Sequence, residues 1–161
     1  MPTPEFVLQL REKIGSHRLW LSGATAVVLR PGPDSEEVLL IQRSDTGEWT
    51  PVSGIVDPGE HPHVTAAREV AEETGVVAEV ERLAWLTVTE VITYANGDQT
   101  QYLDHVFRCR WLSGDPAPGD DEALRTAFFP VDALPPMAQR HLDAIRLARA
   151  EDTTTRLGEP G

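Results

Sequence analysis

The sequence predicts an α/β protein in which helices pack on a mixed β-sheet. The order of the segments leads to this class, because a helical pattern, two strand patterns, a second helical pattern, further strand patterns and a closing helical pattern follow one another. The chain has 161 residues, of which 40% are hydrophobic. This length and composition are typical of one globular domain with a core of its own.

The first half of the chain is expected to contain a short helix, a hairpin and the most regular helix. The expected elements are a helix over 4–15, strands over 24–30 and 37–43 joined by a turn over 31–35, and a helix over 62–74. Phe6, Leu10 and Ile14 recur at helical spacing in the first helix. Pro62 suits the first position of the second helix, and Gly75 suits the residue just after its end.

The second half of the chain is expected to form strands and a closing helix. The expected elements are an extended segment over 76–91, strands over 101–111 and 124–130, and a helix over 136–150. Asn96-Gly97 is a strong signal for a hairpin turn. Leu142, Ile145 and Leu147 form the apolar stripe of the last helix. These patterns predict three regions: an N-terminal helical extension over 1–18, the main domain over 19–150 and a flexible tail over 151–161.

The charge balance and the single cysteine exclude several classes of protein. The chain has 26 acidic and 14 basic residues, which gives a formal net charge of −12. Nucleic-acid binding needs a surplus of lysine and arginine, so nucleic acid is not an expected partner. Cys109 alone cannot form an internal disulfide, and the sequence has neither the start of a signal peptide nor an apolar run long enough to cross a bilayer. We therefore expect a cytoplasmic protein without a membrane partner.

Three carboxylates share one sector of the helix expected over 62–74. With about 100° of rotation per residue, Glu69, Glu72 and Glu73 fall within a sector about 100° wide. The side chains expected to pack against the sheet on the opposite side are Val64, Ala67, Val70 and Ala71. Like charges at this spacing repel, and Arg68 offers one cation, four residues before Glu72. A divalent cation such as Mg²⁺ would remove the repulsion, whereas the alternative is an ordinary solvated helix face.

The run from Gly54 to Val76 resembles the signature of the Nudix hydrolases at each of its nine specified positions. The motif consists of Gly, five residues, Glu, seven residues, Arg-Glu, an aliphatic residue, any residue, Glu-Glu, any residue, Gly and an aliphatic residue. The order of elements over about residues 20–150 is also similar to that of this family. The resemblance implies an α/β/α sandwich with a mixed sheet and a metal-binding helix at about 62–74.

The resemblance also implies a function, namely Mg²⁺-dependent hydrolysis of a pyrophosphate bond in a nucleoside diphosphate derivative, with Mn²⁺ as a substitute cofactor. The implied substrates are small molecules: nucleoside triphosphates, nucleotide sugars such as ADP-ribose, or dinucleoside polyphosphates. The alternative is a nucleotide-sensing module of the same fold without catalytic activity. An isomerase of isoprenoid diphosphates is disfavoured, because that relative needs a cysteine before the motif and Cys109 follows it. A homodimer is compatible with the sequence.

Within the motif, the resemblance assigns a role to each specified polar residue. The residues implied as metal ligands are Glu69, Glu72, Glu73 and, through its main-chain oxygen, Gly54. Glu72 is also the candidate for orienting the attacking water. Arg68 would hold a glutamate through a salt bridge in the catalytic site, and Glu60 would brace the loop before the helix. Gly75 is a structural position of the motif.

Three residues outside the motif are further candidates. In this family an arginine like Arg43, at the end of a strand, lies near the phosphates of the substrate, and a planar guanidinium suits phosphate oxygens. Trp49 could stack on the base of the substrate or pack in the core, and core packing is favoured. The resemblance also implies a carboxylate of the loop at 120–122 as a general base or an extra metal ligand, and Glu122 is the candidate in preference to the two aspartates before it. The chain departs from the family at Pro51-Val-Ser-Gly54, where many relatives have Pro-Gly-Gly.

Overall fold

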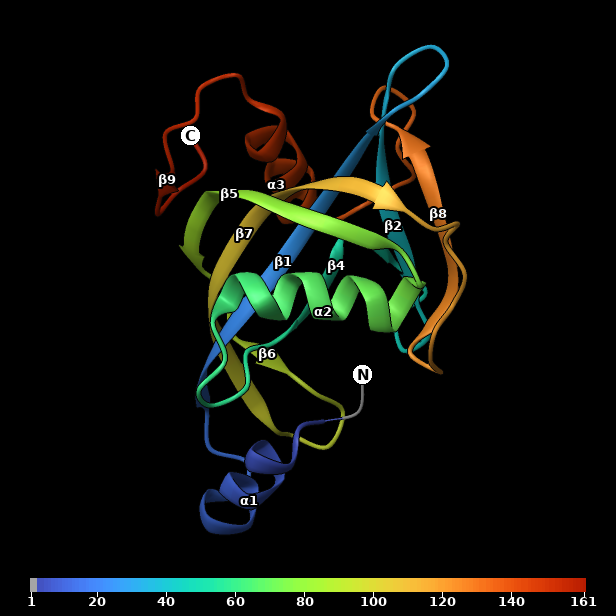
Figure 1. Cartoon of the computed structure of the whole chain (residues 1–161). Coiled ribbons are helices and arrows are strands. Elements are labelled where there is room, and N and C mark those ends of the chain that lie inside the picture. Colours follow the sequence, from blue (N-terminus) through green and yellow to red (C-terminus); the bar gives the residue numbers. More distant parts are fainter. Residues whose placement is uncertain (1–2) are drawn as a thin grey trace.

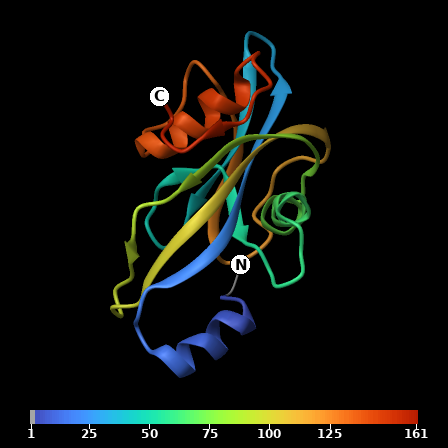
Figure 2. The same cartoon turned by 90° about the vertical axis from the view of Figure 1, so that its left-hand side faces the viewer.

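The structure, a computed structural model, describes residues 3–161 and shows a nine-stranded mixed sheet with helices on both faces. The helices are α1 (Glu5–Ile14), α2 (Pro62–Thr74) and α3 (Gln139–Arg149). The strands are β1 (Leu19–Pro31), β2 (Glu36–Arg43), β3 (Trp49–Thr50), β4 (Val52–Ile55), β5 (Val77–Val88), β6 (Ile92–Thr93), β7 (Gln99–Ser113), β8 (Ala123–Pro130) and β9 (Arg156–Leu157). The sheet runs between α2 and α3 (Figures 1 and 2), which confirms the predicted α/β class. Within residues 3–161, no helix has both the length and the apolar composition needed to span a bilayer.

β1 is the central strand and accounts for the mixed character of the sheet. The spatial order is β3-β2-β1-β7-β5-β9, with β4 also paired to β1, β6 to β7 and β8 to β2. β1 runs parallel to β7, from Leu19 opposite Thr100 to Leu29 opposite Arg110, and antiparallel to β2 and β4. Residues 23–29 are all buried, as expected for a strand that is covered on both faces.

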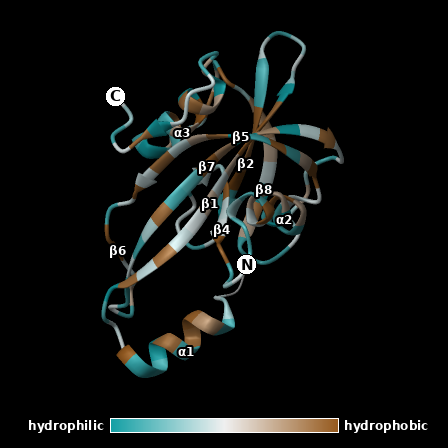
Figure 3. Ribbon diagram, turned by 60° about the vertical axis from the view of Figure 1, so that its left-hand side comes forward, coloured by the Kyte–Doolittle hydropathy of each residue, from teal (hydrophilic) through white to brown (hydrophobic). Residues whose placement is uncertain are grey.

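Successive side chains of β1 point to opposite faces of the sheet and belong to two separate hydrophobic clusters. Ala26 and Val28 belong to the cluster that contains Val70 of α2, whereas Val27 and Leu29 belong to the cluster that contains the buried residues of α3. A third, smaller cluster joins α1 to the start of β1 and contains Val7, Leu19 and Leu21. Hydrophobic and hydrophilic bands lie side by side on α1 (Figure 3), in agreement with the predicted amphipathic helix.

The chain after α3 differs from the flexible tail expected over 151–161. Arg156–Leu157 form β9, which extends the sheet in parallel beside β5. The indole N–H of Trp85 donates a hydrogen bond to the carbonyl oxygen of Gly158 at 2.7 Å. These contacts use main-chain groups of the tail, which every residue carries, so side-chain composition does not predict them.

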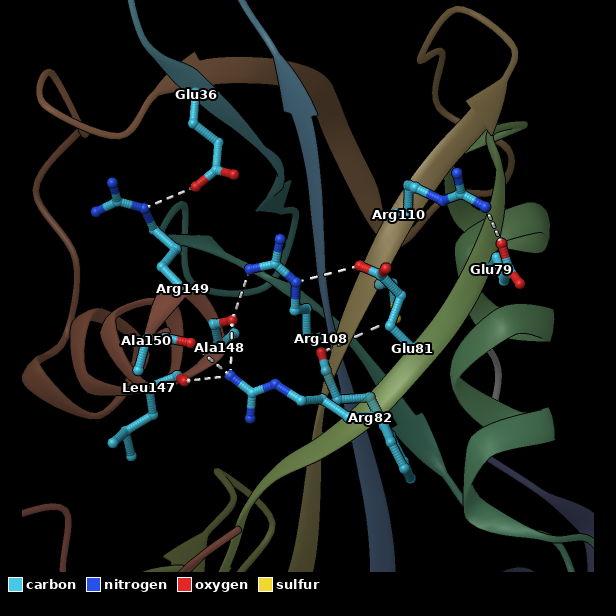
Figure 4. A network of polar contacts seen from close by, with 12 residues as sticks. Glu36, Glu79, Glu81, Arg82, Arg108, Arg110, Leu147, Ala148, Arg149 and Ala150 are labelled. Atoms are coloured by element: carbon cyan, nitrogen blue, oxygen red, sulfur yellow. Dashed lines mark hydrogen bonds and ion pairs between the residues drawn. The ribbon is translucent and has the colours of Figure 1, made fainter. Parts of the chain in front are cut away.

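Two arginines of the sheet hold the C-terminal end of α3. Arg82 of β5 donates hydrogen bonds to the carbonyl oxygens of Leu147, Ala148 and Ala150 at 3.0 to 3.3 Å (Figure 4). Arg108 of β7 also donates to Ala148, at 3.0 Å. The last carbonyl groups of a helix lack partners within the helix and carry partial negative charge. The two arginines therefore stabilise the attachment of α3 to the sheet.

Replacing Arg82 with methionine is expected to lower the free energy of unfolding by about 1–3 kcal/mol, because helix-end carbonyls lose a charged donor. Urea denaturation followed by circular dichroism measures this change. Arg110→Met is the matched control, since the ion pair of Arg110 with Glu79 lies on the surface and should contribute nothing measurable. Equal transition midpoints for the two variants would contradict the stabilising role of Arg82.

Candidate active site

α2 lies on the sheet through a stripe that contains two glutamates. The helix spans the predicted residues 62–74, with Pro62 in its first turn and Gly75 after its end in the left-handed conformation (φ 72°) that glycine adopts readily. The buried residues of the helix are Thr65, Ala66, Glu69, Val70, Glu73 and Thr74. These positions form two adjacent rows with a spacing of four residues, 65, 69 and 73 in one and 66, 70 and 74 in the other, so they make one continuous face.

The orientation of α2 corrects the predicted division of its faces. Val64 and Ala71, predicted to pack against the sheet, are exposed, whereas Glu69 and Glu73 face the sheet. The small side chains at the start of the stripe let the helix lie close to the sheet, and the glutamates four residues further along fall on the same face. Of the three glutamates predicted to share an outer face, only Glu72 lies there.

Glu69 and Glu73 carry buried carboxyl groups whose hydrogen bonding is incomplete. Glu69 is 0% exposed and Glu73 is 3% exposed. The Oε2 atom of each is buried and makes no hydrogen bond within the described part of the chain. An ionised carboxylate that is buried without compensation costs several kcal/mol (roughly 2 or more), so such a pair indicates a site that a cation completes.

Burial raises the pKa values of both carboxyl groups toward neutral pH. Burial raises the pKa of Glu69 to about 7, while the positive charge of Arg68 opposes the rise. Burial and the neighbouring charge of Glu69 raise the pKa of Glu73 to about 8. At neutral pH the metal-free pair therefore retains protons that a bound cation would displace.

β4 passes close to Glu69 because residue 54 is a glycine. A Cβ atom on Gly54 would lie 2.5 Å from Oε1 of Glu69 and closer still to its Cγ and Cδ atoms. Glycine permits this close approach of main chain and carboxylate. Carboxylate and main-chain oxygens are the donors that hard divalent cations prefer, so the residues present fit Mg²⁺ or Mn²⁺.

Glu72 is not gathered with the buried pair. Its side chain is 48% exposed, and one of its oxygens accepts a hydrogen bond from Arg68 at 3.2 Å. Across residues 3–161, no group of three or more His, Cys, Asp or Glu side chains is arranged to hold a metal ion. The structure thus brings two of the three predicted side-chain ligands together, and the role of Glu72 stays a prediction.

Arg68 links the other acidic residues of the motif. Its guanidinium donates two hydrogen bonds to Glu60, at 2.9 and 3.0 Å, and one to Oε1 of Glu69 at 3.0 Å. Asp57, for which the sequence pattern predicts no role, lies 3.5 Å from the same group. Arg68 therefore connects the loop before α2, through Glu60, to the buried pair and to Glu72.

The loop after β7 closes over the C-terminal end of α2. The amide of Gly119 donates a hydrogen bond to the carbonyl oxygen of Glu73 at 2.9 Å. A Cβ atom on Gly119 would overlap the carbonyl oxygen of Glu72, so this approach requires glycine. After burial and Glu69, the charge of Asp120 is a further cause of the raised pKa of Glu73. Asp120, a less favoured candidate than Glu122 in the sequence, therefore lies within electrostatic reach of the buried pair.

Arg43, at the end of β2, lies near the same acidic groups. Its guanidinium donates two hydrogen bonds to the carboxylate of Asp45, at 2.9 and 2.8 Å. Asp45 raises the pKa of Arg43, and the charges of Glu122 and Glu73 act in the same direction. The structure thus brings Arg43, Glu122 and Glu73 within electrostatic reach of one another. Asp45 was missed because a carboxylate two residues from an arginine is an ordinary feature of a turn.

Trp49 packs in the core, which was the favoured of its two interpretations. Its ring meets that of Phe129 edge to face, with 4.8 Å between centroids. The guanidinium of Arg125 lies over the indole at 5.4 Å from the ring centroid. Trp49 belongs to the periphery of the hydrophobic cluster under α3, on the other side of the sheet from α2. Its predicted part in substrate binding stays a prediction.

The chain is similar to known proteins along most of its length. The family model of the NUDIX domain matches residues 21–148. The NAD-capped RNA hydrolase NudC of Pseudomonas aeruginosa is 34% identical over 125 residues, which cover 71% of this chain and 41% of NudC. The asymmetrical bis(5'-nucleosyl)-tetraphosphatase of Mus musculus is 56% identical over 43 residues, which cover 26% of this chain and 29% of that protein. The matched segments thus span less than half the length of these two relatives.

A solved structure shows the same fold. The crystal structure of a UDP-X diphosphatase superposes with a TM-score of 0.68 at 22% sequence identity, covering 96% of this chain and 74% of that chain. This likeness concerns the fold, whereas the NUDIX domain match concerns the sequence and includes the whole motif from Gly54 to Val76. The chain therefore belongs to the Nudix hydrolase family, whose members act on phosphorus anhydrides.

Proposed function

We propose that the chain is a Mg²⁺-dependent hydrolase that cleaves a pyrophosphate bond in a nucleoside diphosphate derivative. The observation that carries this proposal is the buried pair, Glu69 and Glu73, whose Oε2 atoms have no hydrogen-bond partner within residues 3–161. A divalent cation compensates their charge and leaves coordination positions for phosphate oxygens. The names of NudC, of the tetraphosphatase and of the UDP-X diphosphatase support the class, since each describes hydrolysis of a nucleotide compound.

In this proposal the buried side of α2 holds the cation. Glu69 and Glu73 bind it together with the main-chain oxygen of Gly54, and Arg68 holds Glu69 and Glu60 in place. When bound, Mg²⁺ (or Mn²⁺) polarises a phosphate oxygen and neutralises the charge that develops on it. The exposed side of α2 is then free to face the attacking water.

The attack on phosphorus needs a base and a group that holds the phosphates. Glu72 is half-exposed beside the buried pair, so it can accept the proton of the attacking water, and Glu122 is the alternative base. The planar guanidinium of Arg43 donates two hydrogen bonds to Asp45. When substrate binds, Arg43 would donate the same hydrogen bonds to phosphate oxygens. Cleavage of the anhydride P–O bond yields a phosphate monoester and its partner group.

The test is hydrolysis of a substrate panel. Purified protein is incubated with Mg²⁺ and nucleoside triphosphates, ADP-ribose, other nucleotide sugars, dinucleoside polyphosphates and NAD-capped RNA, and the products are identified by chromatography and mass spectrometry. Cleavage that stops with a chelator supports the proposal. Tight nucleotide binding without cleavage would replace it with a nucleotide sensor. The capped RNA tests the expectation, drawn from the net charge of −12, that nucleic acid is not a partner. The homodimer and the cytoplasmic location stay predictions.

Stabilisation by Mg²⁺ is expected to increase with pH. Both carboxylates must be deprotonated to bind a metal ion, and their raised pKa values, about 7 for Glu69 and about 8 for Glu73, mean that protons compete below about pH 8. In the metal-free protein the folded state binds more protons than the unfolded state between these values and the ordinary 4.5, so stability falls as pH rises through this window.

Differential scanning fluorimetry measures this dependence. Saturating Mg²⁺ should raise the melting temperature by several degrees (about 3–6 °C) at pH near 8.5 and by much less at pH near 6. Glu73→Gln should show no such Mg²⁺-induced rise at either pH. A rise of the same size at both pH values in the wild type would contradict binding at the buried pair.

A further inference from the structure

β8 forms one edge of the sheet and has an open side. It pairs with β2 from Pro130 opposite Glu37 to Ala123 opposite Arg43, and no other strand within residues 3–161 pairs with it. Figure 1 shows β8 on the outer side of β2. Apart from Ala123, the residues of β8 are half-buried or exposed, whereas Val38–Ile41 at the centre of β2 are buried. The side of β8 that faces away from β2 therefore lies at the surface of the molecule.

The hydrogen bonds between β8 and β2 show which main-chain groups of β8 face this open side. The amide of Val131 donates a hydrogen bond to the carbonyl oxygen of Glu36 at 2.9 Å, so these two residues form a hydrogen-bonded pair across the strands. Hydrogen-bonded and non-hydrogen-bonded pairs alternate along an antiparallel ladder. The register of β8 with β2 is regular as far as Arg125, so the N–H and C=O groups of Thr126 and Phe128 point away from β2.

The outward main-chain groups of Thr126 and Phe128 have no partner in the part of the chain that the structure describes. No main-chain group of a loop forms a hydrogen bond with them, and no side chain does so either. An edge strand whose N–H and C=O groups are unpaired is a template for pairing with another strand. The open side of β8 therefore offers the N–H and C=O groups of both residues to a partner.

The opposite edge of the sheet is protected against such pairing, whereas β8 is not. The first half of β5 carries two exposed glutamates, Glu79 and Glu81, and the short strand β9 pairs with the second half. Charged side chains and covering segments are the means by which natural sheets keep their edges from pairing. β8 has one charged residue, Arg125, and its neighbour Leu124 is 56% exposed. The sheet is therefore open to a partner strand at β8.

The charge distribution favours a second copy of this chain as the partner. The chain has 26 acidic residues among 161 and a net charge of −12, yet residues 123–131 contain no acidic residue. Two copies repel each other through their acidic surfaces, so contact between them costs least where acidic side chains are absent. In addition, a strand that meets its own copy about a twofold axis presents the same surface that it contacts. The unpaired groups of each copy are then satisfied by those of the other.

We propose that the chain forms a twofold-symmetric dimer in which the β8 strands of two copies pair in antiparallel orientation. In the register that uses the outward groups of both residues, Ala127 lies on the twofold axis and Thr126 lies opposite the partner's Phe128. Arg125 then lies opposite the partner's Phe129, and a guanidinium interacts favourably with an aromatic ring. No like charges face each other along the paired strands.

The test measures the mass of the protein in solution by size-exclusion chromatography with multi-angle light scattering. The wild type should have twice the mass of one chain. Ala127→Lys and Ala127→Glu each place two like charges at the twofold axis, so each should raise the dissociation constant of the dimer by at least about tenfold. An equimolar mixture of the two variants should recover the dimer, because the introduced lysine then faces the introduced glutamate. Leu157→Lys is the control, since Leu157 is 69% exposed on β9 at the other edge.

A cross-linking experiment tests the register with a smaller change. At a non-hydrogen-bonded pair the Cα atoms of opposite residues are about 4.5 Å apart, which is within the range that a disulfide spans. Mild oxidation of Ala127→Cys should therefore link two chains, as read on a non-reducing gel. The wild type is the control, because its Cys109 is buried.

The outcomes decide the proposal without any measurement of catalytic activity. A monomeric wild type would overturn it, and so would an unchanged dimer in both Ala127→Lys and Ala127→Glu. Should either of these variants not fold, as judged by circular dichroism, the oxidation of Ala127→Cys decides. Linked chains support the pairing of β8 with its copy, and the absence of a link overturns it. The proposed function stands in each case.

Discussion

Replacing Glu73 with glutamine is expected to abolish Mg²⁺-dependent hydrolysis and to stabilise the metal-free protein. The glutamine keeps the size of the side chain but removes one of the two buried negative charges. Loss of a proposed metal ligand should lower kcat by about 10³-fold or more, because the charge that develops on the phosphate is no longer neutralised. The same result is expected for any substrate that the wild type cleaves.

The stabilising effect follows from the raised pKa of Glu73. Burial and the charge of Glu69 disfavour the ionised carboxylate, so above about pH 8 the folded metal-free protein contains a buried charge whose Oε2 atom has no hydrogen-bond partner within residues 3–161. Glutamine should therefore increase the free energy of unfolding by about 1–3 kcal/mol at pH near 8.5 without metal. At pH near 5 the carboxyl group is protonated in the folded state, and the gain should largely disappear.

Glu72→Gln is the matched control for this prediction. Glu72 lies on the same helix but is half-exposed, so its replacement should lower activity without a stability gain in the metal-free protein. Chemical denaturation with a chelator present, combined with initial rates in Mg²⁺, measures both effects. A Glu73→Gln variant that is less stable than the wild type at pH near 8.5 would contradict the destabilising effect that we expect from this buried carboxylate.

Replacing Gly54 with alanine is the second change with a large expected effect. The new Cβ atom would lie 2.5 Å from Oε1 of Glu69 and closer to two of its carbon atoms. Glu69 is fully buried and cannot move aside, so either β4 or α2 must shift. We expect a loss of about 1–3 kcal/mol in the free energy of unfolding and a decrease of about 100-fold or more in kcat.

Ser53→Ala is the control. It shows whether the effect of Gly54→Ala comes from the overlap of the new Cβ atom with Glu69 or from any substitution in β4. Ser53 precedes Gly54 and directs its side chain to the other face of the strand, so its replacement should leave stability and Mg²⁺ dependence close to wild type. Thermal denaturation and steady-state kinetics of the two variants provide the measurement. Wild-type activity in Gly54→Ala would show that main chain and carboxylate do not need this close approach.

Local rules predicted the ends of α2 but not its orientation. Pro62 and Gly75 act within the helix itself, so the bounds follow from the sequence. The face that a helix buries depends on the sheet that it meets. A hydrophobic pattern places Val64 inside, whereas the stripe that fits the sheet contains Glu69 and Glu73. The buried glutamates of this stripe are the clearest structural sign of function. Their burial follows from the packing of the helix on the sheet, which the sequence pattern does not show.

The motif identified the family because its spacing carries chemical information. Contacts between residues that are far apart in the chain were not predictable in the same way. Asp104 of β7 accepts a hydrogen bond from Arg140 of α3, and these two residues lie far apart in the chain. Asp120 approaches Glu73 because Gly119 lets its loop contact the end of α2. No local pattern distinguishes such an aspartate from one in an ordinary turn.

The most direct test of the account is a titration with Mn²⁺ followed by electron paramagnetic resonance, because free and bound Mn²⁺ are measured separately. The account predicts that wild-type protein binds the ion at pH near 8.5 and that Glu73→Gln, shown by circular dichroism to be folded, binds it at least about tenfold more weakly. Equal affinity in the two proteins would contradict the central claim that the buried pair of Glu69 and Glu73 forms the metal site.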